Sequence, residues 1–279
     1  VALVWLLVTQ LGVTLGILLF FAIFIATAAS GVHLIQAGML LDVTWALISQ
    51  FIAASMAFYL NFRTQYRLRQ QIKKQFEHYL DPRQVKQLQK NPELLKLGGE
   101  TRYCTFLFTD LRGFTSLSEK LTPQEVTEVM NATLTVQVEE IQRAGGLVDK
   151  FIGDACMAIF SAPLDLEDQE GRAVTAAIRI QERVKMLNDT LPVEVAIGVG
   201  VNSGEAVVGN MGSNTRFDYT AIGDAVNVAA RLESATKEAG ADILIGHNTA
   251  QNCKFLLKSL EPIKVKGKSE PLRIYTWDS

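Results

Sequence analysis

Cys104-Thr-Phe-Leu-Phe-Thr-Asp110 is an apolar stretch that ends at a carboxylate, and it decides how the second half of the chain folds. Its aromatic and β-branched residues predict a buried strand that ends at Thr109-Asp110. Residues 147–152 and 156–161 indicate two more strands, joined as a hairpin around Gly153-Asp154. We expect these strands to be neighbours, so that Asp110 and Asp154 lie at adjacent strand ends.

Two carboxylates at adjacent strand ends can share a pair of divalent cations. Mg²⁺ and Mn²⁺ prefer oxygen ligands. Two such ions suit an in-line displacement at phosphorus, because one activates the attacking hydroxyl and both stabilise charge in the transition state. Either carboxylate alone would more simply be a strand-end cap. Together, Asp110 and Asp154 predict a site for two metal ions.

Strands and amphipathic helices follow one another on both sides of this pair. Thr122-Pro-Gln-Glu125 is a capping box with Pro at the first helical position, and it predicts a helix that runs to about Ala144. Further helices are expected at 165–188 and 224–239, and strands at 193–201, at 206–209 after a turn at 202–204, and at 219–222, 243–245, 263–265 and 272–277. Hairpins mixed with helices predict an α+β fold, with the helices mainly on one face of the sheet.

Four motifs in this half of the chain, in this order, resemble the signatures of the class III adenylyl and guanylyl cyclases. They are Phe108-Thr-Asp-Leu-Arg-Gly-Phe-Thr115, Phe151-Ile-Gly-Asp-Ala-Cys-Met-Ala158, Tyr219-Thr-Ala-Ile-Gly-Asp-Ala-Val-Asn-Val-Ala-Ala-Arg-Leu232 and Val265-Lys-Gly-Lys268. The resemblance covers roughly residues 97–277. It implies that residues 97–279 form the catalytic domain of that family, a ferredoxin-like mixed sheet with flanking helices.

The resemblance also implies roles for individual residues. The main-chain oxygen of Leu111 would join Asp110 and Asp154 as a metal ligand. Asn227 would orient the ribose, and Arg231 would stabilise charge on the α-phosphate with its planar, permanently charged guanidinium. The two are four residues apart on a predicted helix and so share one face. Without the resemblance, that face would be an ordinary exposed polar face.

The triphosphate is expected to meet two further parts of the chain. Gly113 to Thr115 open a predicted helix, so the N–H groups of Phe114 and Thr115 can receive phosphate oxygens. The resemblance implies that Lys266 holds the terminal phosphates. A lone lysine in a Lys-Gly-Lys turn would otherwise simply be solvated.

Lys150 and Thr220 are expected to select the base. In the family, a lysine at the first position with Asp or Thr at the second goes with adenine. Lysine can donate to adenine N1 and threonine can accept from the exocyclic amine, whereas guanine reverses donor and acceptor at these edges. The resemblance therefore implies ATP as substrate and cyclic AMP as product. Thr220 matches a threonine-bearing subclass that includes bicarbonate-responsive members.

In the resembled family, the metal aspartates come from one subunit and the base, ribose and phosphate contacts come from the other. This chain contains each half of the set once. The resemblance therefore implies a homodimer with two equivalent active sites across a two-fold axis. Each active site would hold two Mg²⁺ or Mn²⁺ ions.

The first part of the chain differs sharply in composition, because Asp42 is its only Asp, Glu, Lys or Arg up to residue 62. Residues 3–29 and 43–61 are apolar and long enough to cross a bilayer, so a transmembrane segment is expected over residues 1–62. A pair of buried helices in a soluble bundle is the alternative. Because the chain starts inside an apolar stretch, we expect it to be part of a longer protein with a sensor upstream.

Basic residues follow the second apolar stretch at once: Arg63, Arg67, Arg69, Lys73 and Lys74. By the positive-inside rule this end faces the cytoplasm, which predicts a multi-pass protein of the inner (cell) membrane with a cytoplasmic catalytic domain. Residues 63–96 are expected to form a helical linker. Its apolar stripe could form a short parallel coiled coil or lie on the membrane surface.

Composition and motifs limit the classes of function that the chain could have. The chain carries 27 basic and 29 acidic residues, and this balance argues against a nucleic-acid partner. Its three cysteines have no metal-ligand spacing and are expected to be buried thiols. A catalytically silent receptor and a guanylyl cyclase remain alternatives. A diguanylate cyclase is disfavoured because its Gly-Gly-Asp/Glu-Glu-Phe signature is missing from the sequence.

Overall fold

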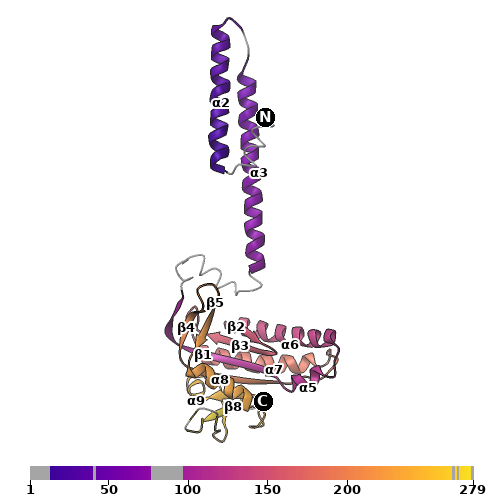
Figure 1. The fold of residues 1–279 in the computed structure, drawn as a ribbon. Helices are drawn as coiled ribbons and strands as arrows, with labels where there is room; N and C mark the ends of the chain where they lie inside the picture. Colours follow the sequence, from indigo (N-terminus) through magenta and orange to yellow (C-terminus); the bar gives the residue numbers. More distant parts are fainter. Residues whose placement is uncertain (1–12, 40–41, 77–96, 266–267, 269, 278–279) are drawn as a thin grey trace. The chain divides into compact units, whose positions relative to one another are not determined.

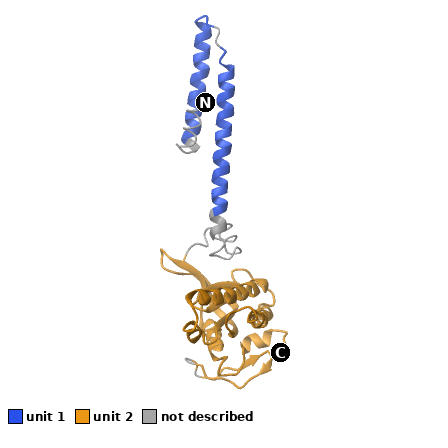
Figure 2. Cartoon of the chain, turned by 90° about the vertical axis from the view of Figure 1, so that its right-hand side faces the viewer, with its two compact units in different colours: residues 1–80 blue, residues 81–279 orange. Residues whose placement is uncertain are grey.

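The computed structural model describes residues 13–39, 42–76, 97–265, 268 and 270–277. The chain divides into two compact units, residues 1–80 and residues 81–279, which Figure 2 distinguishes by colour. Predictions for residues 1–12, 77–96 and 266–267 lie outside the described residues, and these include the far half of the linker and Lys266.

The first unit contains two helices, α2 (Val13–Gln36) and α3 (Thr44–Phe76). They pack through small side chains, with Ala54 and Ala57 buried against Phe20 and Ile23. Most of their large apolar side chains are exposed. By length and composition, Leu15–Gln36 and Thr44–Gln71 could each cross a membrane.

The boundaries of these helices differ from the expected ones. The first membrane span was expected to end at residue 29, but α2 continues through Gln36. The Ser30 hydroxyl donates to the main-chain oxygen of Ala26 at 2.8 Å, so its polarity is satisfied within the helix. Likewise, α3 does not end at residue 61 but continues without a break into the linker as far as Phe76.

The second unit is built on one eight-stranded sheet, in which seven strands lie in the order β2-β3-β1-β4-β6-β8-β7 and β5 pairs with β4. Its strands are β1 (Gly98–Leu111), β2 (Leu147–Ile152), β3 (Ala155–Phe160), β4 (Ile197–Gly212), β5 (Phe217–Ile222), β6 (Ile243–Gly246), β7 (Lys258–Ser259) and β8 (Ile274–Thr276). Only the β4–β6 pair is parallel among the described pairs. The predicted α+β fold with a mixed sheet is confirmed.

Helices flank this sheet (Figure 1). They are α5 (Phe114–Ser118), α6 (Pro123–Arg143), α7 (Gln169–Leu187), α8 (Asp224–Ala235) and α9 (His247–Asn252). The capping box at Thr122 starts α6 as predicted, because the Thr122 hydroxyl accepts from Glu125 N and the Glu125 side chain accepts from Thr122 N. The helix expected at 165–188 begins later than predicted, at Gln169. The helix expected at 224–239 ends earlier than predicted, at Ala235, and helix α9 was not predicted.

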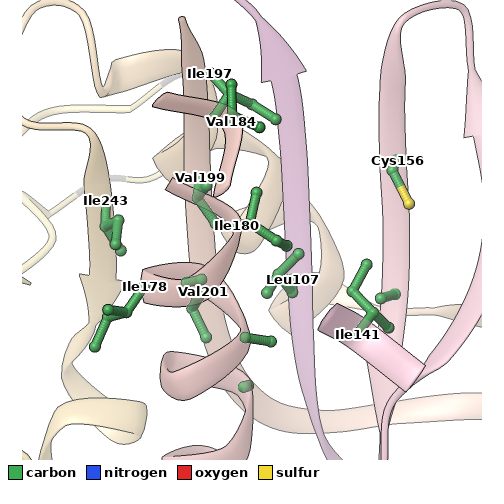
Figure 3. Close-up of a cluster of buried hydrophobic side chains, with 14 of the residues drawn as sticks. Leu107, Ile141, Cys156, Ile178, Ile180, Val184, Ile197, Val199, Val201 and Ile243 are labelled. Carbon is green, nitrogen blue, oxygen red and sulfur yellow. The ribbon is translucent and has the colours of Figure 1, made fainter. Parts of the chain in front are cut away.

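The largest core lies between the sheet and helices α6 and α7. Leu107 and Val199 project from the strands, and Ile141 and Ile180 from the helices, into this cluster (Figure 3). Together these side chains bury a large apolar area. Each Å² of apolar surface removed from water stabilises the fold by about 25 cal/mol. The cysteines are thiols, with Cys104 and Cys156 buried and Cys253 partly buried.

Helix α8 is the exception to the expectation of helices mainly on one face. Its Ala225 and Ala229 pack in a separate cluster with Phe106 and Met157. β1 alternates between this cluster and the core under α6 and α7, as residues 106 and 107 show. Helix α8 can approach β4 closely because Gly200 has no side chain: a Cβ there would lie 2.3 Å from the main-chain oxygen of Ala229.

One strand was predicted wrongly as two. A turn was expected at 202–204, because Asn, Ser and Gly are typical of turns, but β4 runs through these residues. Their polar groups have partners inside the fold: Asn202 Nδ2 donates to the main-chain oxygen of Ala225 at 2.9 Å, and the Ser203 hydroxyl hydrogen-bonds to those of Thr105 and Thr249. The strand expected at 263–265 is only an isolated bridge between Ile263 and Leu272.

Candidate active site

Asp110 and Asp154 lie next to each other in the structure. Thr109 of β1 is paired with Cys156 of β3, so the end of β1 lies beside the turn that carries Asp154. Gly153 in that turn has a φ of 65°, a left-handed conformation that favours glycine. The Asp110 and Asp154 side chains are close enough for the charge of Asp154 to act on Asp110. The fold therefore brings together the two carboxylates that the sequence paired.

The surroundings of Asp110 make its carboxyl group harder to ionise. Burial and the neighbouring Asp154 raise the pKa of Asp110 from its ordinary value to about 6. A third acid, Glu233 on α8, has a pKa raised to about 7 by burial and by the charge of Asp110. The sequence offered no signal for Glu233, because its proximity arises only when α8 packs across β4. The end of β1 is thus a region of concentrated negative charge.

This arrangement suits a divalent cation. The two carboxylates repel when both are ionised, and a cation between them would remove that repulsion. Within the described part of the chain, no group of three or more His, Cys, Asp or Glu side chains could hold a metal by itself. Two carboxylates and the main-chain oxygen of Leu111 would leave coordination positions for a phosphate-bearing substrate, which is how Mg²⁺ is commonly bound.

Phe114 and Thr115 begin the short helix α5 directly after this strand end. Gly113, the residue before it, has a φ of 68°, which turns the chain sharply from strand to helix. The Phe114 side chain packs against the core, whereas Thr115 is exposed. The first main-chain N–H groups of any helix lack partners within it, so those of α5 are available to an anion.

Asn227 and Arg231 lie on α8, on the face opposite its buried residues. Asn227 is exposed and Arg231 partly exposed, whereas Val228 and Leu232 are buried. Among the described residues, neither Asn227 nor Arg231 makes a hydrogen bond or ion pair with Asp110 or Asp154. In the described part of the chain, the residues predicted to contact the ribose and the α-phosphate are therefore not bonded directly to the predicted metal ligands.

Lys150 and Thr220 come together through a residue that the sequence reasoning missed. The Thr220 hydroxyl donates to Oδ2 of Asp149, and Lys150 Nζ lies 3.8 Å from Asp149 Oδ1. Thr220 is on β5 and Lys150 on β2, so the contact links two strands that are not neighbours in the sheet. The sequence did not indicate a role for Asp149, because neighbouring residues of a regular strand face opposite sides of the sheet. That alternation would place the Asp149 and Lys150 side chains on different faces.

The chain matches the family model of the adenylate and guanylate cyclase catalytic domain over residues 99–277. It is 38% identical over 188 residues to an adenylate cyclase of Anabaena cylindrica, which covers 63% of this chain and 36% of that protein. The chain thus spans about a third of the length of that curated relative.

Solved structures give a similar result. The fold is similar to the adenylyl cyclase CyaB from P. aeruginosa, with 36% identity and a TM-score of 0.61, over 66% of this chain and 97% of that chain. It is also similar to the guanylyl cyclase Cya2, with 34% identity and a TM-score of 0.59, over 64% of this chain and 93% of that chain. The two similarities are nearly equal, so overall likeness does not distinguish the purine base.

Proposed function

The chain belongs to the adenylate and guanylate cyclase catalytic domain family, and we propose that it is an adenylyl cyclase that converts ATP to 3′,5′-cyclic AMP and pyrophosphate. In this reaction the ribose 3′-hydroxyl attacks the α-phosphorus, the bond to the β-phosphate oxygen breaks, and the hydroxyl proton is released. The observation that carries the proposal is the adjacent Asp110–Asp154 pair with its raised Asp110 pKa.

The proposed metal ligands are Asp110, Asp154 and the main-chain oxygen of Leu111. Two Mg²⁺ or Mn²⁺ ions bound there would activate the 3′-hydroxyl and balance charge on the phosphates. The N–H groups of Phe114 and Thr115 lie next along the chain, where phosphate oxygens can be received. The protein's part is to hold the two carboxylates close together, and a bound metal ion would favour their ionised form.

The other proposed contacts grip the nucleotide. Asn227 orients the ribose, Arg231 stabilises charge on the α-phosphate, and Lys266 holds the terminal phosphates. Lys150 donates to adenine N1 and Thr220 accepts from the exocyclic amine. Because this chain carries the metal-binding and the nucleotide-binding residues once each, we propose a homodimer in which each active site takes one set from each protomer.

We further propose that α2 and α3 anchor the protein in the inner (cell) membrane as a multi-pass segment, with the catalytic unit in the cytoplasm. The exposed apolar side chains of both helices support a lipid surrounding. Under this proposal Arg63, Arg67 and Arg69 mark the cytoplasmic end of α3.

Product identity tests the proposed activity. The 279-residue chain, purified in detergent with Mn²⁺, would be offered equal ATP and GTP, and the products separated by chromatography and mass spectrometry. We expect 3′,5′-cyclic AMP in large excess. Cyclic GMP in excess would favour the second candidate, a guanylyl cyclase, to which the likeness to Cya2 points. No cyclic nucleotide from either substrate would support a silent receptor and refute the proposal.

A further inference from the structure

A β-bulge in β2 brings Asp149 and Lys150 together. Val148 pairs with Ala158 and Lys150 with Met157, so Asp149 is an extra residue without a partner on β3. In a regular strand, neighbouring side chains point to opposite faces. A bulge breaks this alternation and redirects a side chain. Here it allows the Asp149 carboxylate and the Lys150 ammonium to approach to 3.8 Å.

The Asp149 side chain has no exposed surface, whereas the Lys150 side chain is 39% exposed. One carboxylate oxygen, Oδ2, accepts the hydrogen bond from the Thr220 hydroxyl. The other, Oδ1, is buried without a hydrogen-bond partner among the described residues, and Lys150 is the cation that faces it. Both residues proposed to contact the base therefore interact with one buried carboxylate, Thr220 through a hydrogen bond and Lys150 through an ion pair.

This geometry determines what Thr220 can offer to a ligand. A hydroxyl has a single hydrogen, and here it is directed at Asp149. An ionised carboxylate can only accept hydrogen bonds, so Asp149 cannot donate one to Thr220. The Thr220 oxygen therefore presents only lone pairs to a base. The exocyclic amine of adenine is a donor that fits this acceptor, whereas O6 of guanine is an acceptor that does not.

From this we infer that Asp149 is a positioning residue for base selection: beside the Lys150 ammonium, it holds the Thr220 hydroxyl as an acceptor, and thereby favours ATP over GTP. The inference rests on the proposed cyclase function, because it assigns Lys150 and Thr220 to the base. It adds a buried residue that need not touch the nucleotide.

The test is Asp149→Asn in the full chain, a change that keeps the size of the side chain. The amide oxygen is expected to face the Lys150 ammonium, so the amide N–H₂ faces Thr220 and donates to it. The Thr220 hydroxyl is then free to donate to guanine O6. We expect the ratio of kcat/KM for ATP to that for GTP to fall about tenfold, the effect of reversing one buried hydrogen bond.

Thr220→Val and the double variant complete the test. If Asp149 acts through Thr220, Thr220→Val alone lowers the ratio to a similar extent, and adding Asp149→Asn lowers it no further. The matched control is Asp218→Asn, because Asp218 is an exposed acid on β5 near Asp149 that lies outside the Thr220 hydrogen bond. Its ratio should equal that of the wild type.

The outcomes separate this inference from the proposed function. A wild type that prefers ATP, with an unchanged ratio in Asp149→Asn, overturns the inference and leaves the function intact. Additive effects in the double variant also overturn it, because they would show Asp149 acting apart from Thr220. If Asp149→Asn fails to fold, Thr220→Val decides, and an unchanged ratio there overturns the inference. A wild type that cyclises neither nucleotide overturns both.

Discussion

The catalytic unit contains two carboxylate centres with opposite surroundings. At the end of β1, Asp110 lies against Asp154 and near Glu233, and among the described residues no Lys or Arg forms an ion pair with Asp110 or Asp154. In the bulge of β2, Asp149 accepts from the Thr220 hydroxyl and faces the Lys150 ammonium. The first centre gathers like charges, whereas the second already has its donor and its cation.

The difference separates two uses of a carboxylate. Uncompensated negative charge is unfavourable in a fold by itself, and it becomes useful when a cation arrives with the substrate. A compensated carboxylate has no need of an external ion and can instead fix the direction of hydrogen bonds around it. The two centres should therefore respond differently to substitution, to pH and to metal.

Removal of a carboxylate from the first centre should have the largest effect. Asp110→Ala and Asp154→Ala are each expected to lower cyclase activity on the order of 10³-fold or more, because a metal ligand is lost. The rate of cyclic AMP formation with Mn²⁺-ATP measures this. Asp218→Asn, which removes an exposed acidic charge outside the first centre, is the control. Wild-type activity in Asp154→Ala would contradict a metal site here.

Mixing variants tests whether one active site takes a centre from each protomer. Asp110→Ala and Lys150→Ala chains should each be weakly active alone. After mixing in equal amounts, half of the dimers contain one chain of each kind, and one of their two sites is intact. About one quarter of the wild-type activity should therefore return. Activity no higher than the average of the two single variants would show that both centres serve the same protomer's site.

Metal affinity should depend on pH through Asp110. Its pKa of about 6 means that most of the carboxyl is protonated at pH 5 and ionised at pH 7.5. Because a ligand must lose its proton to bind a metal, Mn²⁺ affinity should fall about tenfold between pH 7.5 and pH 5. Electron paramagnetic resonance of free Mn²⁺ measures this. A flat profile, or one unchanged by Asp110→Asn, would rule out Asp110 as the titrating ligand.

Stability should change in opposite directions at the two centres. The folded-state pKa of Asp110 is raised to about 6 from the ordinary 3.8, so its favourable contribution exists below pH 3.8 and is lost as pH rises through 6. Without metal at pH 7.5, Asp110→Asn should therefore raise stability. We expect on the order of 1 kcal/mol after discounting for solvent screening, or about 2–4 °C in Tm.

At the second centre, Asp149→Ala should lower Tm instead. It leaves the buried Thr220 hydroxyl without its acceptor, which costs about 1–3 kcal/mol. Thermal unfolding of the full chain with a metal chelator compares both variants with the wild type. A shift of the same sign in both would remove the distinction between the two centres.

Sequence patterns were sufficient where a short segment carries its own information. The capping box at Thr122 and the hairpin around Gly153 depend on residues within a few positions, and both are present in the structure. The proximity of Asp110 and Asp154 followed from strand ends that are adjacent in the sheet. The fold class could therefore be predicted before any coordinates.

The missed features depend on contacts between distant segments. Asn202 to Gly204 have the composition of a turn, and only the partners supplied by Ala225, Thr105 and Thr249 keep them in a strand. A bulge leaves no mark in the apolar pattern, which hid Asp149. The roles of Asn227 and Arg231 stay predictions, because their proposed partners lie on a second protomer.

The unbroken helix α3 has a mechanical consequence. A joint requires residues that absorb a change of backbone dihedrals, and a continuous ladder of helical hydrogen bonds from Thr44 to Phe76 resists such a change. Over its 33 residues α3 is about 50 Å long. A rotation about the helix axis, or a translation along it, that is imposed at Thr44 would therefore be transmitted to Phe76 with little loss.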